Sequence, residues 1–315
     1  MSESDVLVLR RGTHGMPVDD LVAEIEARLP DREIALARTP EEERELIEGV
    51  RIVAGMTIGE DLVGEAGEME LFACAYAGTG HLPLSALESA GTKVTSASGV
   101  HGPNIAEHVI GAMLAFTRGF FRARNQQDRR EWRHFQAGEL QGETVTIVGL
   151  GAIGVAIAER LEGFGVETIG VRYTPEKGGP TDEVLGFDGL HDALSTTDHL
   201  VLACPLTEET RGLVGEAEFH TLPPNALLVN VARGPVVDTD ALVGAIRSNQ
   251  LRGASLDVTD PEPLPEEHPL WGFENVQITP HNSGHTPEYY ARFADIVAEN
   301  VERLDRGEEL RNQVI

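Results

Sequence analysis

The feature that most constrains the fold of this chain is a glycine-rich turn between a β-branched run and a helical segment. The run Thr144–Val148 is typical of a strand buried on both faces, and Ala152–Glu162 has apolar residues along one helical face. Between them, Gly149, Gly151 and Gly154 have the spacing G-x-G-x-x-G. In this order the glycines allow a tight turn, close approach of a pyrophosphate and close packing of the helix, whose N-terminus attracts phosphate charge. The alternative is a glycine-rich connection without a ligand. The order strand, turn, helix favours a dinucleotide-binding unit, with Ala152 and Ile153 among its cofactor contacts.

The end of the following strand distinguishes two dinucleotides. An NAD site usually has Asp or Glu at this point, which bonds the ribose 2′-hydroxyl. Here the strand predicted at Val166–Val171 ends in Arg172, followed by Tyr173 and Thr174, and the first acid is Glu176. A guanidinium cannot accept a hydrogen bond from the hydroxyl, but it can pair with a 2′-phosphate. The sequence therefore favours NADP(H) over NAD(H), and a solvated surface arginine is the alternative interpretation.

Three polar residues at the ends of later apolar runs suggest a reaction. They are Arg233 in VNVARGPVVD, Glu262 in LDVTDPEPLP and His281 in QITPHNSGH. An imidazole beside a carboxylate can carry a proton, and a guanidinium can hold a carboxylate substrate. The set predicts hydride transfer to a 2-keto acid, although composition alone would allow His268 or His285 in place of His281.

The first hundred residues alternate between strand-like and helical segments. Amphipathic segments such as Asp19–Leu29 lie between the strands, and Thr39-Pro40-Glu41-Glu42 has the cap, proline and glutamate of a helix start. Five such units predict a small doubly wound sheet of the flavodoxin-like kind. The predicted strands are Val6–Leu9, Glu33–Ala37, Arg51–Ala54, Leu71–Ala75 and Lys93–Ser96.

Five motifs in a fixed order resemble those of the D-2-hydroxyacid dehydrogenases. They are VGLGAIG, CPLTEETRGLV, VNVARGPVVD, LDVTDPEPLP and TPH, and the likeness covers essentially the whole chain. The resemblance implies an α/β protein of two doubly wound domains, with an active-site cleft between them. A Rossmann cofactor domain would span residues 100–285. The substrate domain would be discontinuous, 1–99 plus 286–315, because the family returns its C-terminal helix to the first domain.

The resemblance also implies roles for single residues. His281 would exchange a proton with the substrate oxygen, Glu262 would hydrogen-bond the imidazole and stabilise its charged form, and Arg233 would bind the substrate carboxylate. Asp257 would bond the nicotinamide carboxamide, with a surface Asp as the alternative. The remaining cofactor contacts would be Cys204, Pro205, Thr210, Val231, Ala232, His281 and Gly284.

Substrate contacts are also expected from two loops of the first domain. By resemblance, the backbone N–H groups of Ala77 and Gly78 in YAGTGH bind the substrate carboxylate; the alternative is an ordinary turn. Met56 and Thr57 end another strand and could line the side-chain pocket, although Met56 could equally be plain core.

Two other functions stay open beside an NADP(H)-dependent enzyme. One is an NAD-dependent hydroxypyruvate or phosphoglycerate dehydrogenase, and the other is a dinucleotide-sensing module like the family's corepressor relatives. A formate dehydrogenase is disfavoured, because glutamate stands where that enzyme is expected to have glutamine beside the histidine. Catalytic turnover of NADPH with 2-keto acids would separate the enzyme from the sensor.

The amino-acid composition predicts the ionic and redox conditions in which the protein works. There are 52 acids against 25 bases, a formal charge of −27, and only Lys93 and Lys177 are lysines. Such a charge favours a salt-filled cytoplasm, as in a haloarchaeon, and disfavours nucleic acid as a partner. Cys74 and Cys204 fall in different predicted domains, which fits a reducing cytosol without a disulfide. No membrane span or metal site is indicated, and the family resemblance implies a homodimer through the cofactor domain, with the apolar segment after Asn104 as a candidate contributor.

Overall fold

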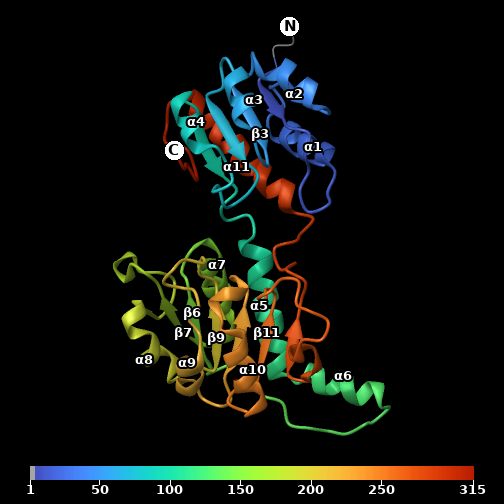
Figure 1. Ribbon diagram of the computed structural model, residues 1–315, viewed down its shortest axis with the longest axis vertical. Coiled ribbons are helices and arrows are strands. Elements are labelled where there is room, and N and C mark those ends of the chain that lie inside the picture. The colour runs from blue at the N-terminus through green and yellow to red at the C-terminus, as the bar shows by residue number, and fades with distance from the viewer. Residues whose placement is uncertain (1–3) are drawn as a thin grey trace. The chain divides into compact units, whose positions relative to one another are not determined.

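The computed structural model describes residues 4–315, which form two compact units (Figure 1). The first unit contains the chain up to Val100 together with His285–Ile315, and the second is His101–Gly284. These limits lie one residue from those expected from the sequence. Within residues 4–315, no helix combines the length and the apolar character needed to cross a membrane.

The first unit is built on a five-stranded parallel sheet in the order β2-β1-β3-β4-β5. This is the flavodoxin-like order, so the predicted fold is confirmed. The strands are β1 (Val6–Val8), β2 (Ile34–Leu36), β3 (Ile52–Gly55), β4 (Leu71–Cys74) and β5 (Lys93–Ser96). The helices are α1 (Val18–Arg28), α2 (Pro40–Ile47), α3 (Glu60–Glu65), α4 (Leu84–Ser89) and α11 (Tyr289–Asp305).

Both faces of this sheet are buried, because alternate strand residues face opposite layers. Val6 and Val8 pack in the cluster that contains Ile25 of α1 and Phe293 of α11. Leu7, between them, packs in the other cluster, against the side of the sheet covered by α2, α3 and α4. Helix α2 begins as expected, since the Thr39 hydroxyl accepts from the backbone N–H of Glu42 at 3.2 Å.

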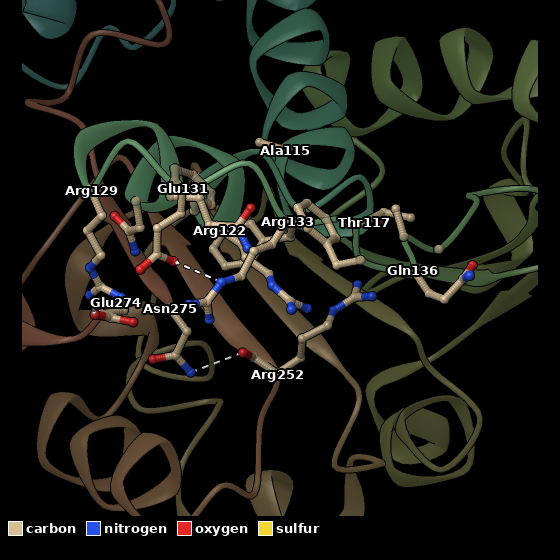
Figure 2. Close-up of a pocket in the computed structure, with 18 residues that line it drawn as sticks. Ala115, Thr117, Arg122, Arg129, Glu131, Arg133, Gln136, Arg252, Glu274 and Asn275 are labelled. Atoms are coloured by element: carbon tan, nitrogen blue, oxygen red, sulfur yellow. Dashed lines mark hydrogen bonds and ion pairs between the residues drawn. The ribbon is translucent and has the colours of Figure 1, made fainter.

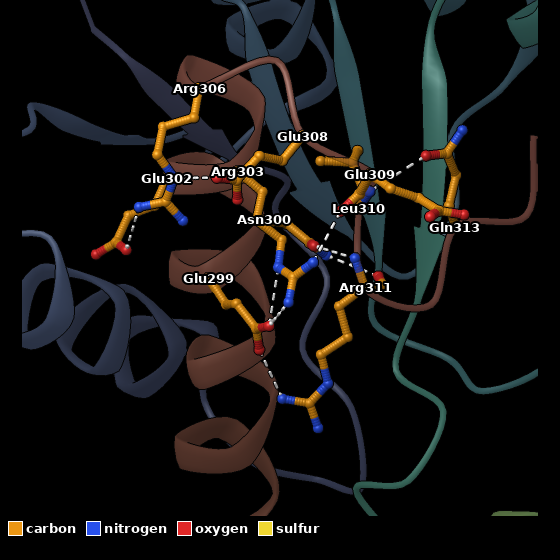
Figure 3. Close-up of polar contacts among 10 residues, drawn as sticks. All are labelled: Glu299, Asn300, Glu302, Arg303, Arg306, Glu308, Glu309, Leu310, Arg311 and Gln313. Atoms are coloured by element: carbon orange, nitrogen blue, oxygen red, sulfur yellow. Dashed lines mark hydrogen bonds and ion pairs between the residues drawn. The ribbon is translucent and has the colours of Figure 1, made fainter.

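The C-terminal segment after α11 is held in place by hydrogen bonds to side chains of that helix (Figure 3). Asn300 is fully buried; its amide donates to the carbonyl of Arg311 at 3.0 Å and accepts from the Arg311 N–H at 2.7 Å. The Arg311 guanidinium donates to Glu299 at 2.9 Å, and this hydrogen bond lowers the pKa of Glu299. The helix starts at Tyr289, inside the segment 286–315 assigned to this domain from the sequence, and Gly307, at φ 67°, follows its C-cap Arg306.

The second unit is built on a seven-stranded parallel sheet in the order β12-β11-β10-β9-β6-β7-β8. The strand order reverses between β6 and β9, which is where such sheets bind ligands beyond the carboxyl ends of their strands. The strands are β6 (Thr144–Val148), β7 (Glu167–Val171), β8 (Glu183–Leu185), β9 (His199–Leu202), β10 (Leu227–Asn230), β11 (Gly253–Leu256) and β12 (Val276–Ile278). The helices are α5 (Gly102–Thr117), α6 (Phe120–Asp128), α7 (Ala152–Leu161), α8 (Leu190–Leu194), α9 (Glu216–Thr221) and α10 (Thr239–Arg247).

The apolar face of α5 is buried inside this unit. Ile105, Val109 and Met113 pack with Ile157 and Leu161 of α7 in one core cluster. The segment after Asn104 was expected to contribute to a dimer; these three residues are used by the chain's own core, and a contribution of the segment to a dimer stays a prediction.

We expect folding to require molar salt, because a net charge of −27 repels itself in dilute buffer. At 1 M salt the Debye length is about 3 Å, so most of this repulsion is screened. Dialysis from molar KCl into dilute buffer should lower the thermal midpoint by at least about 10 °C, which corresponds to a few kcal/mol for a chain of this size. Circular dichroism measures the midpoint, and an unchanged value in dilute buffer would contradict this prediction.

Candidate functional site

Three neighbouring strands bring the predicted polar residues to one edge of the second sheet. Arg233 follows β10, Glu262 lies in the loop after β11, and His281 follows β12. The three strands are parallel and adjacent, so their carboxyl ends meet at the same edge. The same edge holds the glycine turn that follows β6.

His281 and Glu262 form a direct pair. The imidazole Nδ1 lies 2.6 Å from the Glu262 Oε1, and the side chains are 46% and 42% exposed. Both line a pocket of about 300 Å³ together with Asp257 and Trp271. Because Glu262 engages Nδ1, the Nε2 atom is left to face a ligand. The arrangement can hold the imidazole in one tautomer and exchange a proton through Nε2.

A buried carboxylate holds the loop that carries His281. Asp257 Oδ1 accepts from the Thr279 hydroxyl at 2.6 Å and from the Asn282 N–H at 3.0 Å. Its Oδ2 accepts from the Ser283 N–H at 3.1 Å and from the Ser283 hydroxyl. Burial alone would raise the pKa of Asp257, but these hydrogen bonds outweigh burial and keep the pKa below its usual range. They brace His281, whose backbone lies in the left-handed region at φ 51°. A bond from Asp257 to a carboxamide stays a prediction.

The turn that carries Arg233 packs tightly against the loop after β11. A Cβ added at Gly234 would lie 1.9 Å from the carbonyl oxygen of Thr259, so only glycine fits there. Asn230, buried at the end of β10, accepts from the Ala232 N–H at 3.0 Å and donates to the Arg233 carbonyl at 3.2 Å. The exposed Arg233 guanidinium donates to the Ala232 carbonyl at 2.6 Å and does not line the His281 pocket. Sequence reasoning missed Asn230, although a polar residue ending the apolar run LLVN was a usable signal.

The glycine turn has the three properties that its spacing predicts. Gly149 has φ 101°, and a Cβ there would lie 2.6 Å from the backbone of Cys204. A Cβ at Gly154 would lie 1.9 Å from the Gly149 carbonyl oxygen, so α7 can approach β6 only with glycine at this point. At Gly151, the cap of α7, a Cβ would meet nothing within 4 Å. The turn thus leaves open space where a pyrophosphate would contact the helix N-terminus, which fits a dinucleotide.

A pocket of about 430 Å³ continues from this turn. Arg172 lines it, half-buried, and its Nη1 donates to the Gly178 carbonyl at 2.5 Å. Lys177, one of the two lysines in the chain, lines the same pocket and was not among the predicted contacts. The scarcity of lysine in this chain was a signal for Lys177 that the sequence analysis did not use. Predicted cofactor residues that line the pocket are Gly149, Gly151, Arg172, Tyr173, Thr174, Cys204, Pro205 and Thr210.

The loop after β9 is held by its own side chains. The buried Thr210 hydroxyl donates to the Pro205 carbonyl at 2.6 Å and accepts from the Thr207 N–H at 2.8 Å. Burial raises the pKa of the Cys204 thiol to about 11, so a neutral thiol lines the pocket as expected. Two of the other predicted cofactor contacts, Ala152 and Ile153, begin α7. Val231 and Ala232 are buried in the turn after β10, and Gly284 lies beside His101.

Comparison with known proteins identifies the family. The family model "D-isomer specific 2-hydroxyacid dehydrogenase, NAD binding domain" matches residues 110–283, most of the second unit. The chain belongs to this family. The dehydrogenase is thus an oxidoreductase that uses a nicotinamide dinucleotide, and the resemblance seen in its motifs is confirmed.

Similar proteins cover both units of the dehydrogenase. A glyoxylate reductase from Thermofilum pendens is 36% identical over 260 residues, which are 80% of this chain and 76% of that protein. A D-3-phosphoglycerate dehydrogenase from Methanocaldococcus jannaschii is 31% identical over 304 residues, which are 95% of this chain and 58% of that protein. The solved D-isomer specific 2-hydroxyacid dehydrogenase from Xanthobacter autotrophicus Py2, in complex with NADPH and MES, is 28% identical with a TM-score of 0.81, covering 99% of this chain and 98% of that one.

In the first unit of the dehydrogenase, two loops hold the remaining predicted residues. Met56 and Thr57 follow β3, and the exposed Ala77 and Gly78 follow the neighbouring β4. Met56 is half-buried against the core, and its carbonyl lies 2.8 Å from the Nε2 of His81, which links the two loops. Gly78 is exposed, and none of the described residues lies within 4 Å of a Cβ placed there. Binding of a substrate by these four residues stays a prediction.

Proposed function

We propose that this dehydrogenase interconverts 2-keto acids and D-2-hydroxy acids with NADP(H), and that His281 is its general acid and base. The observation that carries the proposal is the contact of 2.6 Å between His281 and Glu262. This pair lies at the sheet edge that also carries the glycine turn. An imidazole oriented by a carboxylate is the arrangement expected of a group that transfers a proton.

The roles follow from the chemistry of each side chain. A bound nicotinamide dinucleotide supplies or accepts the hydride. His281 donates a proton from Nε2 to the substrate oxygen during reduction and takes it back during oxidation. Glu262 keeps the Nδ1 side engaged and stabilises the imidazolium, because a nearby anion favours the charged form. The Arg233 guanidinium binds the substrate carboxylate with a charge-assisted pair.

The preference for NADP(H) rests on two cations in the pocket next to the glycine turn. Arg172 and Lys177 both line it, and no acid stands at the end of β7. The contact of Arg172 with the Gly178 carbonyl ties the strand end to the turn that presents Lys177. A 2′-phosphate would therefore meet positive charge from two chain segments. The Xanthobacter relative, solved with NADPH, is consistent with this proposal.

An NAD(H)-dependent activity is the second candidate, and one observation favours it. Glu209 lines the same pocket, and a carboxylate there could accept hydrogen bonds from ribose hydroxyls. Its hydrogen bond with Thr207 lowers the pKa of Glu209, so it is ionised at neutral pH. A 2′-phosphate close to Glu209 would be repelled.

A substrate panel in molar KCl tests the proposal. We expect oxidation of NADPH with small 2-keto acids such as glyoxylate and hydroxypyruvate, at a higher kcat/KM than with NADH. Preference for NADH would contradict the assignment of NADP(H) but would still support the interconversion of 2-keto acids and D-2-hydroxy acids. Binding of the dinucleotide without turnover of any 2-keto acid would instead favour the sensor interpretation.

A further inference from the structure

Helix α11 begins with two buried tyrosines, and the hydroxyl of each contacts a loop at the carboxyl edge of the first sheet. The Tyr290 hydroxyl accepts from the Thr13 N–H at 2.9 Å and donates to the Met16 carbonyl at 3.3 Å, in the loop after β1. The Tyr289 hydroxyl donates to the carbonyl of Ala75, directly after β4. The two tyrosines thus fasten two different loops to the start of one helix.

The carbonyl that Tyr289 contacts lies two residues before the predicted donors to the substrate carboxylate. These donors are the backbone N–H groups of Ala77 and Gly78, which are exposed, and the described part of the chain offers them no acceptor. Successive backbone N–H groups of this kind can bind an anion. Their direction depends on the peptide units before them, because each residue has only two soft backbone dihedrals. The placement of Ala75 therefore governs where the two N–H groups point.

Neighbouring strands hold other polar groups at the end of β4. The Ala75 N–H donates to the Gly55 carbonyl at 2.8 Å, and the Tyr76 carbonyl accepts from the Ala97 N–H at 3.0 Å. The Ala75 carbonyl is directed to α11 instead, where Tyr289 is its partner. A buried carbonyl that loses its partner is unfavourable, so this peptide would reorient toward water or another donor. The hydroxyl of Tyr289 thus keeps the peptide after β4 in its present direction.

Packing and protonation both fix the Tyr289 hydroxyl as a donor. The ring belongs to the apolar cluster that also contains Val100 and Phe293. The His14 imidazole meets this ring edge-on, with centroids 4.8 Å apart, and stacks on the His285 ring at 4.4 Å. Burial raises the pKa of Tyr289, so the hydroxyl keeps its proton at neutral pH. A donor held in this way is suited to keep a carbonyl in one place.

We propose that Tyr289 is a positioning residue of the substrate site. Its hydroxyl holds the Ala75 carbonyl and thereby directs the N–H groups of Ala77 and Gly78 to the carboxylate of the 2-keto acid. This inference rests on the proposed function and on the predicted binding of the carboxylate by this loop. It gives the C-terminal helix a part in substrate binding, although Tyr289 itself touches no substrate.

The change Tyr289→Phe removes the hydroxyl and keeps the ring in its cluster. We expect KM for the 2-keto acid to rise at least about 10-fold, the lower end for loss of a hydrogen bond to a charged group. The value of kcat and the affinity for NADPH should change little, because the hydroxyl contacts neither His281 nor the glycine turn. Steady-state kinetics in molar KCl separate the effect on KM from the effect on kcat.

The matched control is Tyr290→Phe, which removes the neighbouring hydroxyl from the loop after β1. It should lower the thermal midpoint by a similar amount and leave KM unchanged, because no substrate contact is assigned to that loop. A merely structural role of Tyr289 would make the two variants alike. An unchanged KM in Tyr289→Phe, with turnover of 2-keto acids in place, would overturn the inference.

Hydrogen exchange at Ala97 tests the positioning step without turnover, and so separately from the proposed function. The Ala97 N–H donates to the Tyr76 carbonyl, so its protection reports whether the peptide after β4 stays in place. Exchange should be about 10-fold faster in Tyr289→Phe, the scale of one lost hydrogen bond, and unchanged in Tyr290→Phe. Equal rates in the two variants would overturn the inference. Faster exchange in Tyr289→Phe, from a chain that reduces no 2-keto acid, would overturn the proposed function and support the positioning of the loop.

Oxalate probes the carboxylate contact, because it carries the carboxylate of a 2-keto acid. The second unit has a pocket of about 680 Å³ that can also attract it, lined by four arginines, Arg122, Arg129, Arg133 and Arg252 (Figure 2). The readout is therefore the NMR signals of the Ala77 and Gly78 amides, and not total binding. Oxalate should shift both signals in the wild type, and the same shift in Tyr289→Phe should need at least about 10-fold more oxalate. Oxalate that shifts other amides but not these two would overturn the inference, and this wild-type result stands even where a variant does not fold.

Discussion

Replacing His281 with Asn is expected to lower kcat for 2-keto acid reduction about 10²–10⁴-fold, the usual scale for losing a general acid or base. The amide keeps a similar shape but has no proton to give at neutral pH. Cofactor affinity should change little, because His281 is one of many predicted cofactor contacts and the glycine turn follows a different strand of the sheet. The measurement is kcat at saturating keto acid, with dinucleotide affinity measured by fluorescence titration.

The control for this variant is His191→Gln, at an exposed histidine on α8 that bonds Thr221 away from the site. It should retain wild-type turnover. A companion change, Glu262→Gln, keeps a hydrogen-bonding side chain near Nδ1 but removes its charge. Reduction needs the protonated imidazole, so activity should be lost at lower pH in this variant than in the wild type. Near-normal turnover of the His281 variant would remove this residue from the mechanism.

The fold was largely predictable from sequence because its signals are local. The β-branched run before Gly149 and the apolar spacing after it predict β6 and α7 without any long-range information. Strand β8 was missed, since it is a three-residue edge strand in a segment rich in glycine and proline. Helix α6 was missed for a different physical reason, because with no buried face it has no apolar period to detect.

The candidate site was less predictable, because it depends on strand order. Nothing local distinguishes His281 from His268 or His285; only the adjacency of β11 and β12 places it beside Glu262. The pairing of His281 with Glu262 was predicted from the family resemblance of the motifs, and the spacing of the two residues in the sequence does not indicate it. The Asp257 contacts with Thr279, Asn282 and Ser283 join residues 22 to 26 positions apart, and a single sequence does not show which distant residues meet.

Changing Arg172 to Asp is expected to reverse the cofactor preference. A charge-assisted pair with a 2′-phosphate contributes about 1.5–3 kcal/mol, so its loss should weaken NADPH roughly 10–150-fold. The new carboxylate would also repel the phosphate and accept from the ribose hydroxyl of NADH. Molar salt screens part of the charge interaction with the 2′-phosphate, so the loss of NADPH affinity should lie near the smaller end of this range.

Lys177 is expected to limit the change in the preference for NADPH over NADH, because it lines the same pocket and remains in the Arg172→Asp variant. Lys177→Met alone should weaken NADPH less than Arg172→Asp does, and the double variant should show the largest shift. Lys93→Met on β5 and Arg247→Asp on α10 serve as controls for removing a lysine and reversing an arginine elsewhere.

The measurement is kcat/KM for NADPH and for NADH at one fixed salt concentration. NADH activity reports whether each variant is folded, because that cofactor has no phosphate at the 2′ position. A selective loss with NADPH is therefore a loss of phosphate recognition and not of structure. A wild type that prefers NADH, or an Arg172→Asp variant whose preference ratio does not move, would contradict the role of Arg172; parallel losses with both cofactors would instead assign it to the Gly178 contact that shapes the pocket.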